Sequence, residues 1–127
     1  MVVRYAYNRQ VTPPAPFVHV TVRAPYDGSP GVELPGQIDT GADLSVIPGR
    51  LVDQLRLVPL DSISTAGFGG HLLTLPTFVV ELRIRELTPV TTKIVASSDE
   101  TFALIGRDVL NRFTIMLDGP NFALELR

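Results

Sequence analysis

The residues best suited to chemistry lie in one short stretch, where Asp39 ends an apolar segment and is followed at once by Thr40 and Gly41. A carboxylate beside buried surface must be paired, hydrogen-bonded or partly protonated, because transfer of a charge out of water is costly. Thr40 places a hydroxyl beside the acid, and Gly41 permits a tight turn that another molecule can approach closely. The stretch is therefore suited to acid–base chemistry by a positioned carboxyl group.

Two further segments stand in a fixed order behind this one. Residues 103–110 read Ala-Leu-Ile-Gly-Arg-Asp-Val-Leu, and Gly67-Phe68-Gly69-Gly70 lies between them and Asp39. The stretch Ile38-Asp39-Thr40-Gly41-Ala42 resembles the active-site loop of aspartic proteases. Residues 103–110 resemble the segment near the C-terminus of the retroviral-type subgroup, the retropepsins, and residues 67–70 fall where that family carries its flap. The resemblance spans about residues 17–127.

The resemblance implies that this chain is an aspartic endopeptidase and acts as a homodimer on a peptide or protein substrate. In such enzymes two neighbouring carboxylates share one proton and activate water, because like charges side by side cannot both ionise cheaply. The chain offers one such loop, so the second carboxylate would be Asp39 of another copy, brought face to face by a two-fold axis. Thr40 resembles the residue that bonds the partner loop, and Gly41 the one whose carbonyl receives substrate backbone.

The resemblance also assigns residues to substrate binding and to structure. Asp43 and Arg107 would form an ion pair inside the fold, and Asp43 would contact substrate backbone as well. The other substrate-binding residues that we expect, including the flap, are Ala42, Gly67, Phe68, Gly69, Gly70 and Leu104. With Val46, Ile47 and Phe68 in the cleft walls, specificity should favour apolar side chains.

Other interpretations stay open at this point. The Asp39 loop could be an ordinary turn whose carboxylate bonds nearby backbone, and the glycines of residues 67–70 could form a plain β-turn. Asp108 matches no functional residue of the family. The whole chain could be a catalytically weak peptide-binding or dimerisation module, or a processing protease that mainly cuts a longer chain containing it.

Composition limits the alternatives further. The chain has 127 residues, of which 45% are apolar and 19% charged, with a net charge of −2 and no cysteine. These values fit one compact domain and exclude a thiolate site, and no basic patch suggests nucleic acid. Two histidines without a carboxylate cluster make a poor metal site, so we expect no metal and no cofactor. No apolar run suggests a signal peptide or a membrane span, so we expect a cytoplasmic protein.

Hydrophobic patterning predicts a mostly β domain over residues 17–127, preceded by an extended N-terminal arm over residues 1–16. Residues 17–23 alternate, with Val18, Val20 and Val22 on one face, and residues 32–38 should return antiparallel and end at Asp39. Short helices are expected from Pro48 and over residues 107–112. Pro76 should break the return arm of a long hairpin. The resemblance implies a single-lobe, retropepsin-like closed β-barrel that is homodimeric. The remaining strands are expected at residues 44–47, 62–66, 72–87, 90–96, 102–105, 113–117 and 122–126.

Overall fold

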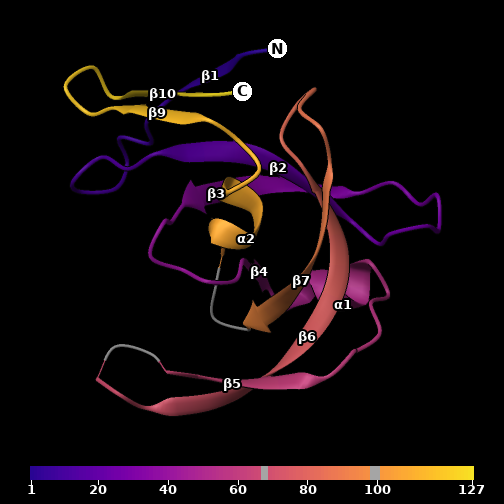
Figure 1. Ribbon diagram of the computed structural model, residues 1–127. Helices are drawn as coiled ribbons and strands as arrows, with labels where there is room; N and C mark the ends of the chain where they lie inside the picture. Colours follow the sequence, from indigo (N-terminus) through magenta and orange to yellow (C-terminus); the bar gives the residue numbers. More distant parts are fainter. Residues whose placement is uncertain (67–68, 98–100) are drawn as a thin grey trace.

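The computed structural model describes residues 1–66, 69–97 and 101–127 (Figure 1). Within these residues the chain is mostly β with two short helices, as predicted. The elements in chain order are β1 (Val3–Ala6), β2 (Phe17–Arg23), β3 (Val32–Ile38), β4 (Val46–Pro48), α1 (Arg50–Gln54), β5 (Ser62–Ala66), β6 (Leu72–Arg83), β7 (Val90–Ser97), β8 (Ala103–Ile105), α2 (Arg107–Leu110), β9 (Ile115–Asp118) and β10 (Ala123–Leu126).

Seven strands form the main sheet in the order β2-β3-β8-β4-β7-β6-β5. β2 also pairs with β6, so that the pairings return to the strand from which they began. β2 and β3 are antiparallel, as predicted, whereas β3 pairs in parallel with β8 and β4 in parallel with β7. The β3–β8 pair brings the two parts of the chain that carry the sequence motifs side by side.

A smaller sheet contains both ends of the chain, in the order β1-β10-β9 (Figure 1). The β9–β10 hairpin is the predicted one, with Leu124 opposite Leu117. The N-terminal arm contains a strand that the sequence pattern did not indicate, because β1 is only four residues long. β1 pairs with β10 over its whole length, and Val3 is buried. The arm is therefore attached to the C-terminal hairpin through backbone hydrogen bonds.

The core follows from alternation along the strands. Val18, Val20 and Val22 of β2 are buried, as period-two patterning predicts. Leu51 of α1 and Val109 of α2 cover the strands, and both are fully buried. Burial of such side chains contributes about 1.5–3 kcal/mol each relative to exposure. The largest fully buried side chains are those of Val18, Val20, Val22, Ile47, Leu51, Val80, Leu82, Ile84, Ile94, Ile105, Leu124 and Leu126.

Two prolines behave differently from the prediction. Pro48 is the last residue of β4, and α1 begins two residues later at Arg50. β6 runs through Pro76 without a break, because Pro76 lies opposite Ser62 at the end of the β5–β6 ladder, where β7 is not its partner. A proline is tolerated where a strand has a free edge, so the strand continues.

No helix among residues 1–66, 69–97 and 101–127 is long and apolar enough to cross a membrane.

Candidate active site

Asp39 lies at the point where β3 ends beside β8. In the β3–β8 pair Gln37 lies opposite Leu104 and Ile38 opposite Ile105. The Asp39 backbone N–H extends this ladder by donating to the carbonyl of Ile105, at 3.0 Å. The parallel β3–β8 pair therefore makes the Asp39 loop and the segment after β8 neighbours in space. In sequence, Thr40 and Arg107 are 67 residues apart.

The loop after Asp39 is a tight turn that is closed by hydrogen bonds to Asp39. The Gly41 N–H donates to Asp39 Oδ1 at 3.0 Å, and the Ala42 N–H donates to the Asp39 carbonyl at 3.2 Å. Asp39 is half-buried, whereas Thr40 and Gly41 are exposed. One carboxylate oxygen is thus oriented by the backbone of its own loop, and the two residues after it are exposed to solvent.

A buried polar contact anchors the far end of the loop. Ser45 is only 1% exposed, and both its backbone N–H and its hydroxyl donate to the Asp108 carboxylate, the hydroxyl at 2.8 Å. The Ser45 hydroxyl oxygen in turn accepts a hydrogen bond from the Gly106 N–H at 2.9 Å. Hydrogen bonds to a carboxylate are stronger than neutral ones. This Ser45–Asp108 contact ties the loop to the start of α2.

Sequence reasoning gave Asp108 no role, and the structure shows it as an anchor of the candidate site. The sequence carried a signal for Ser45 alone, which is the single polar residue of Leu44-Ser45-Val46-Ile47, whereas Asp108 directly follows the charged Arg107. A buried polar residue needs a partner, so Ser45 called for one without indicating which. What the pattern did not contain was the parallel β3–β8 register that brings Ser45 and Asp108 together.

Gly106 is required by close approach of two backbones. A Cβ at this position would lie 2.9 Å from the carbonyl oxygen of Ala42 and 2.9 Å from the carbonyl carbon of Leu44. The next residue, Arg107, donates its N–H to that same Ala42 oxygen at 2.9 Å. The loop therefore rests directly on the backbone at Gly106, and a side chain there would push the two segments apart.

Arg107 contacts the loop through its side chain. One guanidinium nitrogen donates to the carbonyl of Thr40 at 2.7 Å, and the other pairs with the Asp43 carboxylate. The prediction that this pair lies inside the fold is wrong for the single chain, because the side chains of Arg107 and Asp43 are 44% and 84% exposed. An exposed pair contributes little to stability, about 0–1 kcal/mol. The hydrogen bond from Arg107 to the Thr40 carbonyl nevertheless connects the loop to α2.

The predicted cover of the site is a hairpin formed by β5 and β6, but its tip is only partly described. Gly69 and Gly70 have φ values of 92° and 80°, which favour glycine, whereas Gly67 and Phe68 lie outside the described residues. Leu72 and Leu73, just after the tip, are both exposed. The hairpin thus carries apolar side chains that are not part of the core.

The predicted cleft walls divide into two groups. Leu104 and Val46 are half-buried neighbours in the β4–β8 pair and present part of their surface. Ile47 is fully buried in the core, so its prediction as a wall residue is wrong. Alternation along the strand explains the error, because consecutive residues of β4 face opposite sides.

The other acids of the site are already engaged, which limits the available chemistry. Asp108 accepts hydrogen bonds from Ser45 and from the Val109 N–H, and Asp43 is paired with Arg107. No group of three or more potential metal ligands occurs among the residues that the structure describes. In the part of the chain that the structure describes, these contacts place no second carboxylate beside Asp39.

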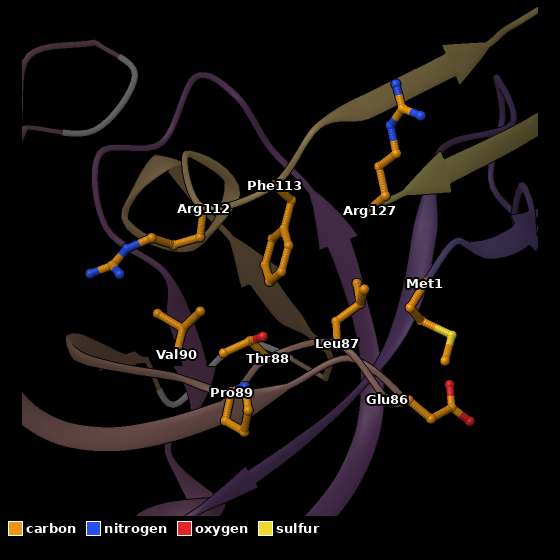
Figure 2. A pocket seen from close by; sticks show the side chains of 9 residues that line it. All are labelled: Met1, Glu86, Leu87, Thr88, Pro89, Val90, Arg112, Phe113 and Arg127. Atoms are coloured by element: carbon orange, nitrogen blue, oxygen red, sulfur yellow. The ribbon is translucent and has the colours of Figure 1, made fainter.

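A cavity of about 420 Å³ lies elsewhere, between the chain ends and the β6–β7 turn (Figure 2). Leu87 and Phe113 lie in the middle of its lining, while the guanidinium groups of Arg112 and Arg127 point away from one another. None of its lining residues belongs to the Asp39 loop or to the flap hairpin. This cavity is therefore separate from the candidate active site.

Solved structures with the same fold are found among aspartic proteases. A retropepsin-like aspartic protease from Rickettsia conorii matches with a TM-score of 0.67 at 18% identity, over 99% of this chain and 89% of that one. EIAV protease matches with a TM-score of 0.63 at 20% identity, over 85% of this chain and 93% of that one. The retroviral protease-like domain of Ddi1 from Leishmania major matches with a TM-score of 0.53 at 16% identity, over 87% and 86%.

No protein-family model matches the chain, and no curated protein sequence matches it significantly. The likeness is therefore one of structure, and it shows that the chain has a retropepsin-like fold. The expectation drawn from the Asp39 loop, the Gly106 segment and the hairpin between them is confirmed at the level of fold.

Proposed function

We propose that the protein is an aspartic endopeptidase in which Asp39 and its copy in a second chain activate water for peptide-bond hydrolysis. The observation that carries this proposal is the anchored single carboxylate: Asp39 is oriented by Gly41, and its loop is held by Asp108 and Arg107. A rigidly held acid is what acid–base catalysis requires. The fold, shared with retropepsin-like aspartic proteases, supports the same chemistry.

In the proposed mechanism the two Asp39 carboxylates share one proton. Two like charges side by side cannot both ionise cheaply, so one group stays protonated while the other accepts a proton from water. The protonated group gives its proton to the scissile carbonyl oxygen as the water attacks the carbonyl carbon. The C–N bond then breaks as the other carboxyl group passes the proton that it took from water to the leaving amine, and the remaining product hydroxyl returns a proton to the first group. Each of these steps uses only the two carboxyl groups and the water between them.

Homodimerisation is part of the proposal because one chain supplies one Asp39. Two surface features support it. Thr40 and Gly41 are exposed beside the acid, where a two-fold copy would meet them. Met116 and Leu117 of β9 are 50% and 48% exposed at the edge of the smaller sheet. An apolar strand edge of this kind is suited to pairing with another chain.

Substrate contacts follow from the same arrangement. We assign Gly41, Ala42 and Asp43 to the substrate backbone, and the flap residues Gly67 to Gly70 to its opposite side. Leu104 presents partly buried apolar surface next to the loop, so apolar side chains are the proposed preference around the cut bond. A peptide-library profile that prefers charged residues on both sides of the cut would contradict this assignment.

The deciding experiment compares the natural chain with Asp39→Asn on a mixed peptide library, from neutral to mildly acid pH. This substitution keeps the size of the side chain and removes its acid–base function. We expect cleavage by the natural chain and none by the variant. If both are silent and peptides still bind, the proposal fails in favour of a peptide-binding module.

A further inference from the structure

The flap hairpin leaves the main sheet at one definable point. Residues 77–82 of β6 pair with β7, whereas residues 72–76 pair only with β5. β5 is the last strand in the order of the main sheet. Residues 62–66 and 72–76 therefore extend beyond the sheet as two paired strands, as the lower part of Figure 1 shows. Two strands alone are marginally stable, so the orientation of the hairpin depends on contacts at its base.

Asp61 and Thr77 make those contacts. Their backbones are paired, with the Thr77 N–H donating to the Asp61 carbonyl at 2.9 Å and the Leu60 N–H donating to the Thr77 carbonyl at 2.8 Å. The Thr77 hydroxyl accepts from the Asp61 N–H at 3.3 Å and donates to the Asp61 carboxylate. Thr77 is fully buried, at 0% exposure. The contact between Asp61 and Thr77 therefore lies where the hairpin joins the core.

A third element joins the same contact. Lys93 of β7 lies with its Nζ 3.4 Å from Asp61 Oδ2. Asp61, the residue directly before β5, is therefore connected through its carboxylate to both β6 and β7. The hydrogen bond from Thr77, with a smaller contribution from Lys93, holds the pKa of Asp61 below its ordinary value. Asp61 consequently remains charged at the mildly acid pH at which a proton-sharing pair of carboxylates would work.

We propose that Asp61 is a positioning residue whose carboxylate, held by Thr77 and Lys93, fixes the angle at which the flap hairpin leaves β6 and covers a bound peptide. The inference rests on the proposed function. Its physical basis is that a two-stranded extension pivots about its base, so a contact that ties the base to two sheet strands restricts the pivot. Asp61 touches neither the Asp39 loop nor its anchors through any hydrogen bond among the described residues.

Peptide cleavage provides the first test. With Asp61→Ala we expect KM to rise about 5- to 10-fold and kcat to change less than about twofold, because the cover is weakened while the carboxylate pair is intact. Thr77→Val should act in the same direction, and Thr77→Ser should restore KM because it keeps the hydroxyl. Glu33→Gln, at an exposed carboxylate of β3, is the control and should leave both constants unchanged.

A second test does not depend on turnover. Because the chain has no cysteine, two introduced thiols can be spin-labelled selectively. We suggest Thr74→Cys on the flap hairpin and Arg50→Cys on α1, both exposed. Asp61→Ala should broaden the distribution of distances between the two labels, and Glu33→Gln should not.

The two tests separate the possible failures. An unchanged distance distribution would overturn the hinge role of Asp61, whether or not the natural chain cleaves peptides. A broadened distribution in a chain without cleavage would support the hinge and contradict the proposed function. A lower melting temperature with unchanged KM and unchanged distances would mean that Asp61 only stabilises the fold.

Discussion

The Asp39 loop and the flap hairpin are both glycine-containing turns, but they are attached to the fold in opposite ways. The Asp39 loop is bound along its length, with contacts from Ile105, Gly106, Arg107 and Asp108. In the flap hairpin, residues 62–66 are hydrogen-bonded to residues 72–76, and Asp61 and Thr77 make contacts at its base. The difference fits the proposed function, in which the acid must be held still while a cover must open to admit substrate.

The largest effect should come from the Ser45–Asp108 contact. Asp108→Ala leaves the buried Ser45 N–H and hydroxyl without their acceptor, so we expect the free energy of unfolding to fall by about 3 kcal/mol. Cleavage should be lost with it, because the loop is released. Asp108→Asn keeps one acceptor oxygen and should cost less. Chemical denaturation of both variants checks this, and equal losses would contradict the role given to the carboxylate.

The close approach at Gly106 should give the next largest effect. Gly106→Ala forces a methyl group against the backbone of Ala42 and Leu44, and we expect a loss of about 2 kcal/mol from overpacking. Gly119→Ala, in the β9–β10 turn, is the matched control, since nothing lies within 4 Å of its added Cβ. Thermal melting of the two variants measures the difference. Similar melting temperatures would show that the loop can move aside.

The flap hairpin should respond differently to substitution. Leu72→Ser removes an exposed apolar side chain next to the tip, so the free energy of unfolding should change by less than about 0.5 kcal/mol. KM for an apolar peptide should nevertheless rise, because under the proposed function the flap hairpin covers the substrate. Val58→Ser, at an exposed apolar residue outside the hairpin, should change neither quantity. A large loss of stability for Leu72→Ser would place this residue in the core.

The smallest effect concerns acid pH and the base of the hairpin. The folded protein lowers the pKa of Asp61 below 3.8. The stabilisation that the Asp61 carboxylate gives to the base of the hairpin is therefore fully present above that value and is lost as the pH falls through the pKa of the folded state. The distances between the labels at residues 50 and 74 should therefore broaden only below about pH 3.8. Asp61→Asn should remove this pH dependence. Broadening that persists in the variant would assign the transition to another group.

Sequence reasoning predicted the regular parts of the molecule well. β2, β3 and β5 have the predicted bounds, since alternation and turn residues are local signals. The four-residue β1 was missed because its partner, β10, is at the other end of the chain. For the same reason no pattern showed that Ser45 and Asp108 would meet. The exposure of the Asp43–Arg107 pair also depends on how the loop packs, which spacing does not encode.

The central claim is that catalysis needs Asp39 from two chains, and subunit mixing tests it directly. Natural chain at fixed concentration is mixed with increasing Asp39→Asn chain, refolded together and assayed for peptide cleavage. If both acids are required, cleavage per natural chain should fall in proportion to the natural fraction, to about half in an equal mixture. Cleavage per natural chain that stays constant at every ratio would contradict the account.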